Sequence, residues 1–302
     1  MVNLETTLCG VRLKNPVMPA SGVYGFGTEF LDFYDPNLLG AVVLKGTTLH
    51  PRFGNPLPRV AECRAGMINS VGLQNPGVHA VLDEELPALR AFYHGPVVAN
   101  VSGFSVEEFA ECCALMDGNA ELLEVNVSCP NVHGGGMSFG ATPEAAAEVV
   151  RAVRKRVRQS PVFVKLSPNV RDIAEIARAC EAEGADGLTL INTLLGMRID
   201  LRTRKPEIAN KMGGFSGPAI FPVALRMVYQ CAKAVKLPII GVGGIASAED
   251  ILEMLMAGAR AVQVGAENLR DPFACKRILD ALPETMARYG IKSISEIVGV
   301  CD

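Results

Sequence analysis

Residues 161–193 have the sequence PVFVKLSPNVRDIAEIARACEAEGADGLTLINT. Two short apolar runs in it, Val162–Leu166 and Gly187–Ile191, have the length and composition of buried strands. Between them, apolar residues recur at helical spacing over Asp172–Glu183, and Gly184 follows as a C-terminal helix cap. A helix between two apolar strands predicts a βαβ unit, in which both strands lie parallel in one sheet.

The same alternation extends along the whole chain of 302 residues. Eight strands are expected, at Pro16–Ala20, Ala41–Leu44, Val97–Val101, Leu122–Val127, Val162–Leu166, Gly187–Ile191, Pro238–Val242 and Ala261–Val264. Helices are expected at Ser105–Met116, Thr142–Arg158, Asp172–Glu183, Pro218–Val235, Ser247–Met256 and Pro272–Tyr289. This order predicts an α/β fold, a single (β/α)8 TIM barrel that occupies residues 1–302 as one domain.

Local signals support the helix boundaries and mark two long connections. Ser105 with Glu108 three residues later predicts a capping box, and Ser247 is expected to cap the helix that follows it. The connections His50–Pro76 and Thr193–Gly217 both begin after a predicted strand, so we expect long functional loops at the C-terminal rim. The second contains RIDLRTRKPEIA (198–209), for which we expect an excursion hairpin.

Composition narrows the class of protein. Hydrophobic residues make up 49% of the chain and charged residues 20%, which supports a large core and argues against disorder. The net charge is −3, and the most basic stretch, Arg151–Arg158, has its apolar positions at helical spacing. We therefore expect the solvated face of a helix there, and no nucleic-acid binding.

The nine cysteines include no CxxC pair, and no zinc or iron–sulfur ligand set is visible in the sequence. A reduced, cytoplasmic protein without a metal site is expected. The N-terminus lacks the pattern of a signal peptide, and no apolar run reaches the ~18 residues of a membrane span, so no membrane association is expected. Five cysteines fall in predicted helices and are interpreted as core residues: Cys112, Cys113, Cys180, Cys231 and Cys275.

Polar residues and glycines follow the predicted strands. They are Ser21, Lys45, Asn100, Asn126, Lys165, Asn192, Gly243, Gly244 and Gly265. Because the carboxyl ends of barrel strands share one rim, these residues are expected to surround one pocket. Amides match the donor and acceptor edges of a flavin or a pyrimidine, and lysines indicate a negatively charged ligand. An asparagine after a strand can also simply complete a turn, whereas burying an unpaired lysine is costly.

Glycine-rich turns near the C-terminus indicate a phosphorylated ligand. GGFSG (213–217), VGGI (242–245) and VGA (264–266) each precede a predicted helix or close a strand. Glycines let backbone N–H groups approach an anion closely, and phosphate sites after strands seven and eight recur in TIM barrels. The alternative interpretation is that these glycines only permit tight turns between strand and helix.

Four motifs, in order along nearly the whole chain, resemble those of dihydroorotate dehydrogenases. They are KGTT (45–48), NSVGLQN (69–75), NVSCPN (126–131), which leads into VHGGG (132–136), and GVGGI (241–245). The resemblance implies oxidation of (S)-dihydroorotate to orotate with FMN, in the de novo biosynthesis of UMP. Rival interpretations are a flavoenzyme for dihydrouracil or dihydrothymine, and a flavin-free aldolase or isomerase that uses Lys165 as a Schiff-base lysine.

The resemblance also implies roles for particular residues. Cys129 would be the general base, Lys45 would lie by substrate and flavin, and Lys165 would stabilise negative charge on the reduced flavin. Substrate contacts would come from Lys45, Asn69, Ser70, Val71, Gly72, Leu73, Asn126, Asn131, Asn192 and Thr193. FMN contacts would come from Ser21, Lys45, Gly46, Asn100, Asn126, Lys165, Ile191, Gly217, Gly243, Gly244, Gly265 and Ala266.

The resemblance further separates branches of the family. Members with a membrane quinone as acceptor use a Ser base, whereas this chain has Cys129. HGGGMSFG (133–140) is more similar to the NAD-linked branch than to the fumarate-linked homodimers. In the NAD-linked branch, a homodimer core joins an electron-transfer subunit that carries FAD and an iron–sulfur cluster, which makes a heterotetramer. A fumarate-linked homodimer remains the alternative within the family.

Overall fold

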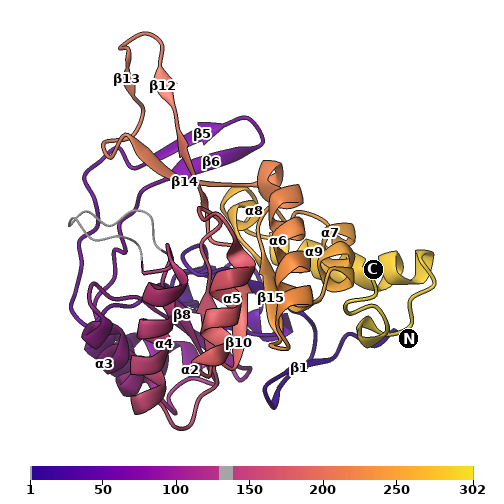
Figure 1. Ribbon diagram of the computed structural model, residues 1–302. Coiled ribbons are helices and arrows are strands. Elements are labelled where there is room, and N and C mark those ends of the chain that lie inside the picture. The colour runs from indigo at the N-terminus through magenta and orange to yellow at the C-terminus, as the bar shows by residue number, and fades with distance from the viewer. Residues whose placement is uncertain (1, 129–138, 302) are drawn as a thin grey trace.

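The computed structural model describes residues 2–128 and 139–301. At its centre lies a parallel sheet of eight strands in the order β3-β16-β15-β10-β9-β8-β7-β4. The sheet curls so that its end strands meet, where Gly40 donates a 2.9 Å hydrogen bond to the Val17 carbonyl, and helices surround it (Figure 1). The strands are β3 (Val17–Pro19), β4 (Val42–Val43), β7 (Val97–Val101), β8 (Leu122–Asn126), β9 (Val162–Lys165), β10 (Gly187–Leu190), β15 (Ile239–Val242) and β16 (Ala259–Val264). The predicted TIM barrel and its eight strands are confirmed.

The outer layer contains the expected helices within a few residues of their predicted bounds. They are α3 (Val106–Met116), α4 (Pro143–Arg156), α5 (Ile173–Ala182), α6 (Phe221–Ala234), α7 (Ala248–Met256) and α9 (Ala274–Arg288), with a short α8 (Ala266–Arg270). Ser247 and Asp250 form a complete capping box at α7. At α3 the box is incomplete, because the Glu108 carboxylate accepts from the amide of Phe104 and not from that of Ser105.

One helical segment was missing from the prediction. It consists of α1 (Val78–Ala80), a π-helical turn η3 (Val81–Glu85) and α2 (Leu86–Arg90). Pro87 lies in the first turn of α2 and has no amide hydrogen to donate within the helix. Four 3-10 turns complete the helical structure of the described residues: η1 (Thr28–Phe30), η2 (Pro36–Leu38), η4 (Pro218–Ile220) and η5 (Ile294–Glu296).

Alternation along the strands separates two apolar cores. Leu122 and Phe163 belong to a cluster inside the barrel, whereas Val125 belongs to the large cluster between strands and helices. Since side chains two apart on a strand share a face, Asn126 and Lys165 project into the barrel at its carboxyl end. At the opposite end, the hairpin of β1 (Thr6–Leu8) and β2 (Val11–Leu13) contributes apolar side chains to the inner cluster.

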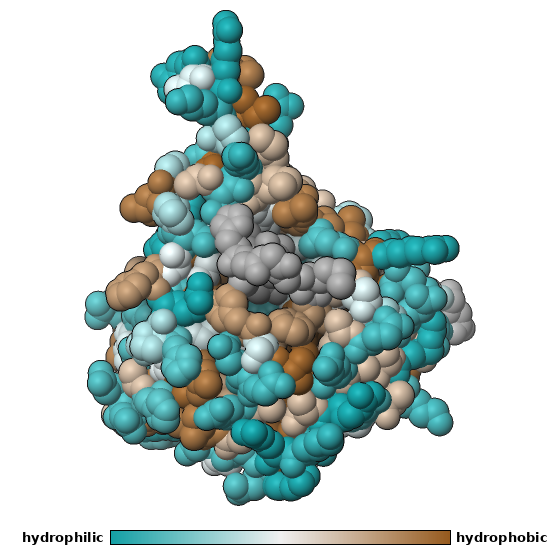
Figure 2. Space-filling view, turned by 60° about the vertical axis from the view of Figure 1, so that its left-hand side comes forward, coloured by the Kyte–Doolittle hydropathy of each residue, from teal (hydrophilic) through white to brown (hydrophobic). Residues whose placement is uncertain are grey.

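The two long connections fold together into a second sheet. It has four antiparallel strands in the order β11-β14-β6-β5, namely β11 (Leu194–Met197), β14 (Met212–Ser216), β6 (Gly66–Asn69) and β5 (Val60–Cys63). The expected excursion hairpin is confirmed as the pair β12 (Ile199–Asp200) and β13 (Lys205–Pro206). The hairpin projects from the body of the molecule (Figures 1 and 2). The pairing of the two connections with each other was not predicted.

The helices pack around the barrel and do not have the properties of membrane spans. None in the described part of the chain combines the length and the apolarity needed to cross a bilayer. The five cysteines expected in the core lie in α3, α5, α6 and α9, and all five are buried. That prediction is confirmed.

The capping box of α7 can be tested by Ser247→Ala. The Ser247 hydroxyl accepts from the Asp250 amide at 3.1 Å, so its loss should lower the free energy of unfolding by about 1 kcal/mol. Urea unfolding followed by circular dichroism measures the change. Glu284→Ala, on an exposed position of α9, is the control and should change stability by less than about 0.5 kcal/mol. Equal stability of the two variants would show that the cap contributes nothing.

Candidate active site at the carboxyl ends of the barrel strands

A cavity of about 400 Å³ opens at the carboxyl ends of the barrel strands. Its walls bring together residues from nearly the whole length of the chain, from Ala20 to Leu269. The residues expected at a site that line it are Ser21, Lys45, Gly46, Asn69, Val71, Gly72, Leu73, Asn126, Lys165, Ile191, Asn192, Thr193, Gly217, Gly243, Gly244, Gly265 and Ala266. The convergence of these segments on one cavity is therefore confirmed.

Four other expected site residues are placed differently. Ser70 and Asn100 are fully buried and are not among the residues that line the open cavity. Ser70 instead holds the wall, since its amide donates to the Arg59 carbonyl at 2.8 Å. Cys129 and Asn131 lie outside the described residues.

The charge of the cavity lining suits an anionic ligand. Lys45 and Lys165 are the charged side chains among the described lining residues, and both are cations. The Lys45 amide donates to the Gly25 carbonyl at 2.9 Å, which fixes the backbone where β4 ends. Lys165 is 5% exposed, so its ammonium is largely withdrawn from water. A partly dehydrated cation attracts an anion more strongly than a solvated one.

Behind Lys165 lies a buried polar network that the sequence prediction missed. Glu124 on β8 is fully buried, and its Oε1 lies 3.4 Å from Lys165 Nζ. The same oxygen accepts from Asn100 Nδ2 at 2.6 Å, and Oε2 accepts from Gln263 Nε2 at 2.6 Å. The sequence signals for this network were an acidic residue inside the apolar run LLEVN (122–126) and Gln263 inside AVQV (261–264).

Amides beside the lysines are held in fixed orientations. Asn192 Nδ2 donates to Asn126 Oδ1 at 3.1 Å and to Ser128 Oγ at 2.7 Å. Asn192 Oδ1 accepts from the Thr193 amide at 2.8 Å. Because each bond assigns one end of an amide as donor or acceptor, the wall presents a defined hydrogen-bonding pattern to a planar ligand.

The turns after β14 and β15 need glycine. Gly217 and Gly244 have φ of 121° and 74°, in the region where residues with a Cβ are strained. A Cβ on Gly244 would also lie 2.6 Å from the Phe221 amide nitrogen, at the start of α6. Both glycines also line the cavity, where exposed backbone N–H groups can approach an anion.

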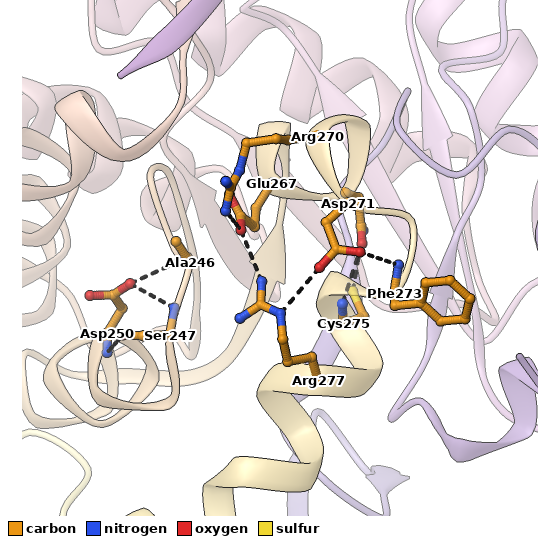
Figure 3. A network of polar contacts seen from close by, with 10 residues as sticks. Ala246, Ser247, Asp250, Glu267, Arg270, Asp271, Phe273, Cys275 and Arg277 are labelled. Carbon is orange, nitrogen blue, oxygen red and sulfur yellow. Dashed lines mark hydrogen bonds and ion pairs between the residues drawn. The ribbon is translucent and has the colours of Figure 1, made fainter. Parts of the chain in front are cut away.

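An acidic residue beside the last glycine turn is neutralised by arginines. Glu267 lies two residues after Gly265, and its side chain is 2% exposed. Its Oε1 pairs with Arg270 at 2.5 Å and with Arg277 at 2.9 Å, and Figure 3 shows both guanidinium groups turned toward it. Two cations on one carboxylate prevent Glu267 from repelling an anion bound nearby.

The thiols buried in the helices have raised pKa values. Burial raises the pKa of Cys112, Cys180, Cys231 and Cys275 to about 12, so these thiols stay protonated and unreactive near neutral pH. In the described ranges, no three His, Cys, Asp or Glu side chains gather as metal ligands would.

A barrel with a cationic, amide-lined cavity at its C-terminal rim defines a TIM-barrel enzyme. The family model described as dihydroorotate dehydrogenase matches residues 3–286, and the chain belongs to this family. A dihydroorotate dehydrogenase B (NAD(+)), catalytic subunit, of Bacillus pumilus is 54% identical over 301 residues, which cover 99% of this chain and 96% of that protein. Its counterpart from Enterococcus faecalis is 50% identical over 297 residues, 98% of this chain and 95% of that one. The resemblance found in the sequence, including that to the NAD-linked branch, is confirmed.

Gly244→Ala tests the backbone geometry of the turn after β15, with Gly184→Ala as a matched control. Both glycines have positive φ, but a Cβ on Gly184 meets no atom within 4 Å. Gly184→Ala should therefore lower stability by about 1 kcal/mol through backbone strain alone. Gly244→Ala adds a clash with backbone and should lower it by about 3 kcal/mol. Urea unfolding measures both, and equal losses would show that α6 yields to the added methyl group.

Proposed function

We propose that this chain oxidises (S)-dihydroorotate to orotate with FMN, as one FMN-binding domain over residues 1–302. The reaction belongs to the de novo biosynthesis of UMP. The observation that carries the proposal is the cavity at the barrel rim, lined by two lysines and fixed amides, in a chain that matches the dihydroorotate dehydrogenase family along nearly its full length.

The lining residues fit FMN. The volume of about 400 Å³ lies in the range of small-ligand pockets, and the lining combines apolar side chains with a few polar groups. Asn100 Oδ1 is buried without a hydrogen-bond partner in the described structure, next to the position that a Cβ on Gly46 would fill. An acceptor held there suits a donor on the edge of a flavin ring. FMN, when bound, supplies a two-electron acceptor for the hydride of the substrate.

Different residues around the cavity would bind different parts of FMN. Gly217, Gly243, Gly244, Gly265 and Ala266 would surround its phosphate, where backbone N–H groups favour an anion. Lys165 would oppose the negative charge of the reduced ring. The remaining contacts would come from Ser21, Lys45, Gly46, Asn100, Asn126 and Ile191.

The rest of the lining would hold dihydroorotate. Asn69, Asn126 and Asn192 offer donors and acceptors to the pyrimidine edges, and Lys45 offers a cation to the carboxylate. Val71, Gly72, Leu73 and Thr193 complete this wall. Asn131 would add an amide. Ser70 would contribute indirectly, by holding the wall segment that follows β6.

Cys129 would act as the general base. Oxidation of dihydroorotate removes one proton and one hydride from neighbouring carbons, and the thiolate would take the proton from the carbon next to the ring carbonyl. A free Cys has a pKa of about 8.5, and a nearby lysine favours the thiolate. The reaction should therefore accelerate as pH rises through the pKa of this thiol.

Electron transfer beyond this chain is also proposed. The names of the relatives include NAD(+) and "catalytic subunit", which favours NAD over fumarate as the final acceptor. We infer a homodimer core with an electron-transfer subunit that carries FAD and an iron–sulfur cluster, in a heterotetramer. The assembly would work in the cytoplasm.

The central test is anaerobic reduction of the purified protein. It should show flavin absorption near ~450 nm, which dihydroorotate should bleach and dihydrouracil should not, because dihydrouracil lacks the carboxylate that pairs with a lysine. A colourless protein, or one that dihydrouracil reduces equally well, contradicts the proposal. Addition of the partner subunit should then couple dihydroorotate oxidation to NAD but not to fumarate.

Cys129→Ala tests the base. The variant should retain FMN while dihydroorotate reduces it about 10²-fold more slowly, which is the usual size for a lost general base. Stopped-flow absorbance measures the rate. Cys301→Ala, at an exposed thiol near the C-terminus, is the control and should reduce at the rate of the unmodified protein. An unchanged rate in Cys129→Ala would exclude this thiol as the base.

A further inference from the structure

Glu124 is a charged group that neither the cavity lining nor the proposed substrate contacts use. It lies on β8, two residues before Asn126, and its side chain has no exposed surface. Burying a carboxylate is costly unless it is paired and fully hydrogen-bonded. An apolar residue of similar size would fill the barrel at a lower cost in desolvation free energy. The buried charge therefore calls for an explanation.

The network fixes Glu124 from three other strands. Asn100 on β7 and Gln263 on β16 each donate to it at 2.6 Å, and Lys165 on β9 lies 3.4 Å away. The two amides are closer than the ammonium, whose distance exceeds the roughly 2.8 Å of a charge-assisted hydrogen bond. Since Lys165 also lines the cavity, it lies between the fixed carboxylate of Glu124 and the cavity.

The other groups considered around Lys165 are a cation, uncharged residues, or a carboxylate paired with arginines. Lys45 lines the same cavity and is also a cation, so it disfavours a second ammonium there. Thr189 on β10 and Asn126 on β8 flank Lys165 in register and carry no charge. Glu267 is committed to Arg270 and Arg277. In the described structure, Glu124 is thus the carboxylate that faces Lys165.

We propose that Glu124 is a positioning residue that keeps Lys165 as an ammonium while the bound flavin is oxidised and uncharged. This inference rests on the proposed function. With the ammonium already present, two-electron reduction needs one proton: FMN + 2 e⁻ + H⁺ gives FMNH⁻. Without the carboxylate, Lys165 is a neutral amine beside oxidised FMN. Reduction then needs two protons, the second of which makes the ammonium opposite FMNH⁻.

The test is the number of protons taken up per two electrons, from the pH dependence of the flavin midpoint potential above neutrality. The unmodified protein should take up one proton and Glu124→Gln two. Glu124→Asp, which keeps the carboxylate, should take up one. Glutamine is accommodated, because the Gln263 amide can turn its Oε1, which is buried without a partner, toward the new NH₂ group. One-proton reduction in Glu124→Gln overturns the inference, because a merely structural residue would not change this number.

Failure of the inference is distinct from failure of the proposed function. If the unmodified protein holds no flavin, or dihydroorotate does not reduce it, the proposed function fails. If the unmodified protein passes both tests and Glu124→Gln still takes up one proton, only the role of Glu124 fails.

If Glu124→Gln is too unstable to bind flavin, a double-mutant cycle tests whether Glu124 and Lys165 act as a pair. Urea unfolding of the flavin-free protein compares Glu124→Gln, Lys165→Met and the double variant. Each single change leaves one buried group without its partner, whereas the double change removes both charges. The double variant should be more stable than the sum of the single losses allows. Additive losses show that the two groups do not act as a pair and overturn the inference.

Discussion

The two-residue periodicity of the barrel strands is the constraint on which the site depends. On β8, Leu122, Glu124 and Asn126 share the inner face, so one strand supplies an apolar layer, a buried carboxylate and a cavity amide in succession. The neighbouring strand β9 sets Lys165 directly across from Asn126 by its parallel register. A shift of β9 by one residue in that register would turn Lys165 toward the helices. The chemistry of the cavity is therefore fixed by the same hydrogen bonds that hold the sheet.

The sequence predicted the barrel well because its strands are buried on both faces. Such strands are nearly continuous apolar runs, and all eight were placed within about two residues of their bounds. The four-stranded sheet was not predicted, because its strands come from two connections more than a hundred residues apart and have no continuous apolar run. Only the local hairpin within one of those connections left a recognisable pattern.

The candidate site was predicted in part, for a similar reason. Residues next to strand ends, such as Lys45 and Asn192, could be placed because strand ends share a rim. Ser70 and Asn100 are fully buried and do not line the open cavity, since a position near a strand end does not reveal where its side chain points. Their roles as ligand contacts stay predictions. Glu124 was missed because its importance comes from partners on three other strands, and no spacing along the chain reveals such a cluster. The roles of Cys129 and Asn131 still rest on the family resemblance.

The composition of the cavity wall also bears on the order of folding. Asn69 on β6 and Thr193 next to β11 reach the cavity from segments whose pairing closes a chain loop of more than a hundred residues. Closing such a loop carries an entropic cost that contacts must repay, and the barrel brings the two segments together beforehand. We therefore expect the mouth of the cavity to assemble after the barrel. A ligand that contacts both the barrel and the mouth would bind only the fully folded protein. Its binding would therefore raise the free energy of unfolding.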